Sequence, residues 1–394
     1  MRKICIFTST RAEWGLLQGV AELVINSERL QLKLLVSGSH LSAKLGMTVD
    51  EIQAAGFRVD ERVDILKFGD SPIGICETMG LAFSAYGKAL QRLSPDLIVI
   101  LGDRYESFCL AAAAQILCIP IAHIHGGETT EGAVDEAFRH SITKMSHLHF
   151  ASCEEYRNRV IQLGESPTKV FNVGALGIEN IRKVQCLTRA ELEESLQFSL
   201  EAPFFLVTFH PVTLERAPAG SQLQQLSNAL DHFPDHKIIF TKANADTDGR
   251  VINAKIDAYL TAHPERCLAV ASLGQLRYLS AMKHCDAVVG NSSSGILEAP
   301  IFHVPTVNIG DRQKGRLRVK SIIDCEDNQA SIVDALNQAL SPDFKQSLTA
   351  LQHPSEKVGT AGAIARHLET SDCPKSLMKK SFYNLNFQTV EHRD

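Results

Sequence analysis

The sequence lacks the patterns by which several common classes of protein are recognised. None of its ten cysteines forms a Cys-x-x-Cys pair, so neither a structural zinc site nor a disulfide framework is expected. No Gly-x-Gly-x-x-Gly follows the first predicted strand, and no Gly-x-x-x-x-Gly-Lys-Ser/Thr segment occurs. A dinucleotide-dependent redox enzyme and an ATP-dependent phosphoryl transferase are therefore disfavoured.

Clustered basic charge and long apolar runs are also missing. Lysine and arginine number 40 against 45 aspartates and glutamates, and the formal net charge is −5. Nucleic acids and anionic membranes favour clustered basic residues, so neither is expected as a partner. The first residues, MRKICIF, enter an apolar strand without a signal-type segment. These features predict a cytoplasmic protein that meets any anionic ligand with a local site.

Short apolar runs alternate with longer amphipathic stretches, and this alternation occurs twice along the 394 residues. Continuous apolar strands separated by helices predict parallel sheets that are covered on both faces. We therefore predict an α/β protein of two Rossmann-like, doubly wound domains. The first is expected at 1–178 and the second at 179–366, followed at 367–394 by a helix that packs back on the first domain and a polar tail.

Polar residues gather directly after the predicted strands in both halves of the chain. Ligands of open parallel sheets bind outside the carboxyl ends of the strands. The recurrence of such strand ends predicts one ligand cleft between the two domains. The residues concerned include Ser9–Arg11, His40, Asp103, Arg104, His210, Asn244 and Arg312.

The segment from Gly290 to Gly295 leads from a predicted strand into a helix. Glycine backbone, serine hydroxyls and a helix N-terminus together suit a phosphate, although the same residues also suit a serine N-cap flanked by loop glycines. Arg11, His210 and Arg312 after other strands favour the phosphate interpretation, and specifically a diphosphate. Glu298 is placed to accept hydrogen bonds from ribose hydroxyls, or is a solvated helix glutamate.

The densest group of ionisable residues lies between 123 and 140. Crowded carboxylates in a dry cleft acquire separated pKa values, so that one can act as base and another as acid. Alternatively, Asp135 supplies charge to a helix start. The candidates are Glu128, Asp135, His125, Arg139 and His140, together with Asp103.

His123 and His125 allow two interpretations. Alternate residues of a strand face the same way, so both imidazoles could meet one metal ion with Asp103. Otherwise one histidine is buried and the other faces the substrate. The further His and Asp ligands of a metallophosphoesterase-like site are missing, so we favour a metal-independent site.

At these residues the chain resembles the hydrolysing UDP-N-acetylglucosamine 2-epimerases of sialic-acid and legionaminic-acid biosynthesis. The resemblance covers roughly residues 3 to 320 and depends on eight motifs in the same order. They are TRAE at 10–13, GSH at 38–40, GDR at 102–104, HGGE at 125–128, RHSITK at 139–144, HP at 210–211, GNSSSG at 290–295 and NIGDRQKGR at 308–316.

The resemblance implies a glycosyltransferase-B-like fold, a UDP-sugar in the interdomain cleft, no added cofactor and a homo-oligomer, dimeric or tetrameric. Asp103 and Asp135 match catalytic carboxylates, with Arg104 and His40 beside them. The UDP-binding residues match Arg11, His210, Ser292, Ser293, Glu298 and Arg312, and more loosely Asn244.

One position departs from relatives such as the animal enzyme. They carry a catalytic glutamate where this chain has His125, so His125 itself or Glu128 is expected to fill that role. Ala12 and Gly126–Gly127 are similar to the hydrolysing branch rather than to the non-hydrolysing epimerases.

The resemblance implies a reaction in which UDP leaves as a carboxylate removes the C2 proton, and water then adds to the resulting 2-acetamidoglucal. We expect UDP-N-acetylglucosamine as substrate, with its 6-deoxy-2,4-diacetamido analogue as the alternative. A non-hydrolysing epimerase, a glycosyltransferase and an inactive UDP-sugar sensor are the competing functions.

Asp103→Asn is expected to retain affinity for UDP and to lose turnover, because an amide cannot accept the C2 proton. Steady-state kinetics and UDP titration check this. Turnover equal to that of the unmodified protein would remove Asp103 from the chemistry.

Overall fold

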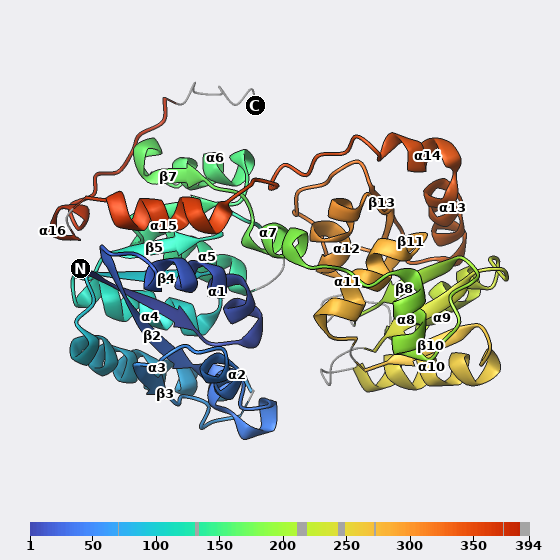
Figure 1. Cartoon of the computed structure of the whole chain (residues 1–394), viewed down its shortest axis with the longest axis horizontal. Helices are drawn as coiled ribbons and strands as arrows, with labels where there is room; N and C mark the ends of the chain where they lie inside the picture. The colour runs from blue at the N-terminus through green and yellow to red at the C-terminus, as the bar shows by residue number, and fades with distance from the viewer. Residues whose placement is uncertain are drawn as a thin grey trace, which may run out of the picture. The chain divides into compact units, whose positions relative to one another are not determined.

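The computed structural model describes residues 1–69, 71–130, 134–210, 219–242, 249–271, 273–372 and 374–386. Their contacts divide the chain into two compact units (Figure 1). Unit 1 comprises residues 1–129, 134–179 and 354–386, and unit 2 comprises Thr130 and residues 180–353. Within these described ranges, no helix is both long and apolar enough to cross a membrane.

Unit 1 is built on a sheet of seven parallel strands, in the order β3-β2-β1-β4-β5-β6-β7. The central strands β4 and β5 are wholly buried, and β4 is a continuous apolar run, as expected for a sheet covered on both faces. The strands are β1 (Arg2–Thr8), β2 (Leu30–Ser37), β3 (Glu61–Val63), β4 (Leu97–Leu101), β5 (Ile121–Ile124), β6 (Leu148–Ala151) and β7 (Val170–Asn172).

Local signals set the start of the first helix of unit 1. Thr10 accepts a hydrogen bond from the Glu13 amide while the Glu13 carboxylate accepts from the Thr10 amide, a capping box. The helices are α1 (Arg11–Ile25), α2 (Val49–Ala54), α3 (Pro72–Leu93), α4 (Tyr105–Ile116), α5 (Asp135–Met145), α6 (Glu154–Gln162), α15 (Thr360–Thr370) and α16 (Pro374–Leu377). The boundary between the units falls within α7 (Leu176–Lys183).

Unit 2 repeats this architecture with six parallel strands, in the order β10-β9-β8-β11-β12-β13. The strands are β8 (Phe204–Thr208), β9 (Lys237–Thr241), β10 (Cys267–Val270), β11 (Ala287–Gly290), β12 (Thr306–Ile309) and β13 (Ile322–Cys325). The helices are α8 (Arg189–Leu196), α9 (Ala219–Leu230), α10 (Gly249–Ala262), α11 (Gly274–His284), α12 (Ser293–Leu297), α13 (Gln329–Leu340) and α14 (Pro342–Ser347).

Both sheets have the Rossmann strand order, in unit 2 over all six strands and in unit 1 over the first six, β3-β2-β1-β4-β5-β6. In each sheet the first three strands are added on one side, and the chain then crosses to the other side of β1 or β8 to add the rest. The predicted fold class, two doubly wound α/β domains, is confirmed. Four strands were not predicted from the sequence: β3, β6, β7 and β13.

The chain after residue 353 returns to unit 1, although residues up to 366 were expected in the second domain. Helix α15 lies beside α1 (Figure 1). Its buried face, formed by Ala361, Ile364 and Leu368, belongs to the same apolar cluster as Leu17 of α1. The apolar spacing of 361, 364 and 368 explains the contact, since these side chains share one face of a helix.

Replacing Leu368 by Ala is expected to destabilise unit 1 by about 2–5 kcal/mol, because it opens a cavity at a wholly buried position. Chemical denaturation measures this, with Arg366→Ala on the exposed face of α15 as the matched control. An unfolding midpoint equal to that of the control would mean that α15 is not part of the core.

Candidate functional site

The polar strand ends of unit 1 come together because β1, β4 and β5 are neighbours in one parallel sheet. Asp103 follows β4, and its carboxylate pairs with the Arg139 guanidinium on α5. Arg139 is 5% exposed, so this ion pair is largely removed from water. The pair joins the end of β4 to the helix that begins with Asp135.

Asp135 differs in its environment from Asp103. Burial raises the pKa of the Asp135 carboxyl, and the negative charge of Asp103 raises it further. Asp103 instead has a direct cationic partner. The two carboxylates therefore lie in different electrostatic environments, an arrangement that suits one of them to act as base and the other as acid.

The two histidines of the His-x-His segment have separate environments. Both ring nitrogens of His123 are engaged, since Nε2 donates to the Gly102 carbonyl at 2.7 Å and Nδ1 accepts from the Thr143 hydroxyl at 3.2 Å. Burial lowers the pKa of His123 to about 3, so the ring is neutral. His123 is therefore a buried structural residue, with both ring nitrogens occupied by protein groups.

His125 leaves the strand in a left-handed conformation with φ +63°, which is uncommon for a side-chain-bearing residue. The alternation that would have aimed it alongside His123 ends at Ile124. Its Nδ1 lies 3.6 Å from Glu128 Oε1, and its buried Nε2 has no protein partner. Among the residues that the structure describes, no group of three or more His, Cys, Asp or Glu side chains is arranged to hold a metal.

The glycines after His125 allow the backbone to turn tightly. Gly127 has φ +82°, and a Cβ there would lie 2.3 Å from the Tyr156 carbonyl oxygen. The turn presents Glu128, which accepts a hydrogen bond from Ser152 Oγ at 3.2 Å. Ser152, Glu128 and His125 consequently form a chain of polar groups that ends in the unpartnered Nε2.

Four other predicted residues of unit 1 have partners of their own. His40 lies between the hydroxyls of Thr8 (2.9 Å) and Thr48 (2.7 Å), and burial lowers its pKa to about 4. It therefore packs as a neutral interior residue. Arg11 forms an exposed ion pair with Glu51. Arg104 pairs with Glu106 at 2.9 Å, and His140 Nε2 lies 3.0 Å from Glu136.

Glu13 is a buried carboxyl that the sequence analysis quoted only as part of a motif. Its Oε2 accepts from the Ser9 amide (2.6 Å), the Ser9 hydroxyl (2.9 Å) and the Thr10 amide (3.1 Å). Burial raises its pKa to about 7. The Thr-x-x-Glu spacing of a capping box was the signal that could have identified it.

In unit 2 the predicted phosphate-binding segment follows β11. Gly290 has φ +132°, and a Cβ there would lie 2.0 Å from the Thr208 carbonyl oxygen, so only glycine fits. Ser292 is the N-cap of α12, and its hydroxyl lies 3.4 Å from the Ser294 amide. Since α12 has only five residues, any anion here would depend on local amides and hydroxyls.

Asn291 ties three strand ends of unit 2 together, a role that its motif did not reveal. Its side chain accepts from the His210 amide at 2.7 Å and donates to the His210 carbonyl at 2.8 Å. Its own carbonyl accepts from Arg312 Nη1 at 3.0 Å and Gln313 Nε2 at 2.9 Å. Residues after β8, β11 and β12 are therefore joined through one buried asparagine.

The remaining predicted UDP-binding residues of unit 2 are Glu298, Ser293 and Asn244. Glu298 ends α12, and burial raises the pKa of its carboxyl to about 7. Ser293 is the first residue of α12. Asn244 lies outside the described residues.

Comparison with known proteins identifies the family. The family described as UDP-N-acetylglucosamine 2-epimerase matches residues 24–369. The GDP/UDP-N,N'-diacetylbacillosamine 2-epimerase (hydrolyzing) of Campylobacter jejuni is 40% identical, over 100% of this chain and 98% of the relative. Polysialic acid biosynthesis protein P7 of Escherichia coli is 37% identical, over 98% of each chain.

A solved structure has the same fold. The UDP-GlcNAc 2-epimerase of Neisseria meningitidis, bound to UDP-GlcNAc, has a TM-score of 0.78 at 17% identity, over 93% of this chain and 99% of that one. The glycosyltransferase-B-like fold implied by the motifs is thereby confirmed. On the family match and the full-length relatives, this chain belongs to the UDP-N-acetylglucosamine 2-epimerase family.

Proposed function

We propose that the protein is a hydrolysing UDP-sugar 2-epimerase that converts a 2-acetamido UDP-sugar and water into the free 2-epimeric sugar and UDP. The observation that carries the proposal is the pairing of Asp103 with Arg139 of α5, the helix that begins with Asp135, in a member of a family of 2-epimerases. The different environments of Asp103 and Asp135 match a reaction that removes a proton from C2 and later returns one.

The first half of the proposed reaction is an elimination. A base takes the C2 proton, the C–H electrons form the C1–C2 double bond, and the C1–O bond breaks as UDP departs. We assign the base to Asp103, because the Arg139 guanidinium holds its carboxylate in a fixed place at the end of β4. Asp135, whose raised pKa favours the protonated carboxyl, is assigned as the acid of the second half.

The second half is hydration of the 2-acetamidoglucal. Water adds its oxygen to C1 and gives up a proton, while a proton is delivered to C2 from the opposite face. We assign that delivery to Asp135, and to His125 the proton that water gives up, since burial lowers the pKa of His125, its buried Nε2 has no protein partner and its Nδ1 faces Glu128. His125 would thereby replace the glutamate expected at this position, with Glu128 orienting the ring.

UDP binding is assigned to unit 2, with Arg312, His210, Ser292 and Ser293 at the diphosphate and Glu298 at the ribose. A cation and loop donors are suited to the charge that develops on the leaving diphosphate. Asn291 supports this assignment, because it joins the segments that carry these residues.

The sugar is assigned as UDP-2,4-diacetamido-2,4,6-trideoxyglucose, the UDP-N,N'-diacetylbacillosamine named for the 40% identical Campylobacter jejuni relative. The sequence motifs favoured UDP-N-acetylglucosamine, the sugar of the family description. It remains the second candidate. The 37% identity to a polysialic acid biosynthesis protein supports a place in nonulosonic acid synthesis with either sugar.

Each UDP-sugar is incubated with the protein in deuterium oxide that contains excess chelator, and proton NMR follows the products. We expect one equivalent of UDP and the free 2-epimer with deuterium at C2, formed faster from the diacetamido sugar. A UDP-linked epimer would contradict hydrolysis. No product from either sugar would contradict the enzymatic function, and faster conversion of UDP-N-acetylglucosamine would reverse the assignment of the sugar.

Asn291→Ala is expected to weaken UDP binding about tenfold or more, because the partly buried His210 amide and carbonyl lose their bonds to Asn291 at a cost of about 1–3 kcal/mol. Calorimetric titration with UDP measures the loss. Asn228→Ala, on the surface of α9, is the matched control. Equal UDP affinity in both variants would show that Asn291 does not organise the nucleotide site.

A further inference from the structure

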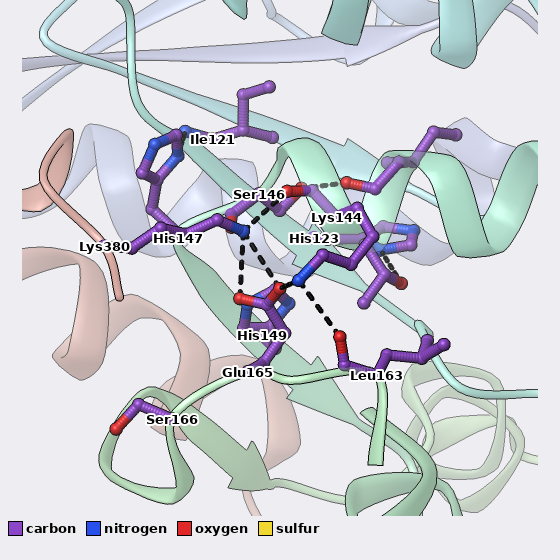
Figure 2. A network of polar contacts seen from close by, with 12 residues as sticks. Ile121, His123, Lys144, Ser146, His147, His149, Leu163, Glu165, Ser166 and Lys380 are labelled. Atoms are coloured by element: carbon purple, nitrogen blue, oxygen red, sulfur yellow. Dashed lines mark hydrogen bonds and ion pairs between the residues drawn. The ribbon is translucent and has the colours of Figure 1, made fainter. Parts of the chain in front are cut away.

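The C-terminal segment from 374 to 386 lies against unit 1, beside chain that precedes it by more than 200 positions. Figure 2 shows Lys380 of this segment facing Glu165, Lys144 and Ser146. Further along, the Tyr383 amide donates to the Gly164 carbonyl at 2.8 Å. Leu385 packs against the small apolar cluster of Val160, Ile161 and Val170. The segment is therefore attached at several points around Lys380.

The ammonium group of Lys380 closes the C-terminal end of α5. Its Nζ donates to the Lys144 carbonyl at 2.5 Å and to the Ser146 carbonyl at 2.8 Å (Figure 2). The last carbonyls of a helix lack intrahelical donors and carry partial negative charge. The Lys380 ammonium supplies both the missing hydrogen-bond donors and a compensating positive charge.

The same ammonium is paired with Glu165, whose side chain is 4% exposed. Lys380 Nζ lies 3.0 and 2.9 Å from its two oxygens, Lys144 Nζ lies at 2.5 Å and His149 Nε2 at 3.1 Å. Burial raises the pKa of Glu165, but the hydrogen bonds from His149, Lys144 and Lys380 outweigh burial and lower it to about 2. Loss of one cation would leave this buried charge less compensated.

Helix α5 links this cluster to the candidate site. Asp135 is its first residue, and Arg139, one turn later, pairs with Asp103. Helix α5 has eleven residues and is about 16 Å long. A displacement of its C-terminal end, where Lys380 binds, would therefore also move Asp135 at its N-terminal end. A second route passes through the sheet, where His149 is in register with His123, which contacts Thr143 of α5.

We propose that Lys380 is a positioning residue for the epimerase reaction: by holding the end of α5, it sets the places of Asp135 and Arg139 relative to Asp103. This inference rests on the proposed function. It assigns a role to the C-terminal segment, which follows the last of the recognised motifs and lies outside the 24–369 family match.

The test is Lys380→Met, which keeps the apolar stem and removes the charge. We expect kcat to fall about tenfold or more, since small misplacements of reacting groups are costly. The inhibition constant for UDP should stay within about twofold, because UDP binding is assigned to unit 2. Lys380→Arg should recover most of the loss, and Lys379→Met, at the exposed neighbouring lysine, should leave kcat unchanged.

Hydrogen exchange of the amides at 135–145 gives a readout that needs no turnover. Faster exchange in Lys380→Met than in Lys379→Met supports the anchoring of α5 by Lys380 even if the unmodified protein acts on neither UDP-sugar, an outcome that would defeat the proposed function and, with it, the role of this anchor in the reaction. Equal exchange in the two variants, or an unchanged kcat in Lys380→Met, would overturn the inference. If Lys380→Met does not fold, Lys380→Gln is measured in its place by the same criteria.

Discussion

The ion pair between Asp103 and Arg139 is the contact on which the candidate site of unit 1 depends. It connects the carboxyl end of β4 with α5, two elements that the sheet alone would not hold at a defined distance. Because Arg139 is buried, its charge acts in a medium of low polarity and is poorly screened. The two aspartates differ in their surroundings: Asp103 is paired with Arg139, whereas burial and then the negative charge of Asp103 raise the pKa of Asp135.

In unit 2 a neutral side chain, that of Asn291, connects segments that are distant in the sequence. Asn291 offers a donor and an acceptor in one amide and can therefore match the backbone of His210 at both groups. Its backbone carbonyl then receives Arg312 and Gln313. One buried polar group thus joins separate strand ends in unit 2, as another joins a strand end to a helix in unit 1. Parallel sheets make this necessary, because each strand end lies far from its neighbour in the sequence.

Much of the fold followed from local patterns. Apolar runs such as DLIVILGD indicated buried parallel strands. Strands β6 and β7 were missed because they are short and their sequences, such as LHFA with its buried His149, lack a continuous apolar run. For His123 and His125 the sequence allowed two interpretations: both rings facing the same way toward a metal ion, or, as we favoured, one ring buried and the other facing the substrate. Period-2 alternation cannot anticipate a residue with positive φ at the strand end.

The sequence by itself determined the two doubly wound domains, the polar residues at their strand ends and the family, because periodicity, turn chemistry and motif order are properties of short stretches of chain. Only the tertiary structure decided which carboxylate meets Arg139, which ring nitrogen of His125 has no protein partner and where Lys380 binds. These depend on contacts between segments as distant as Lys144 and Lys380. Long-range contacts of this kind arise from packing and burial, which no local pattern records.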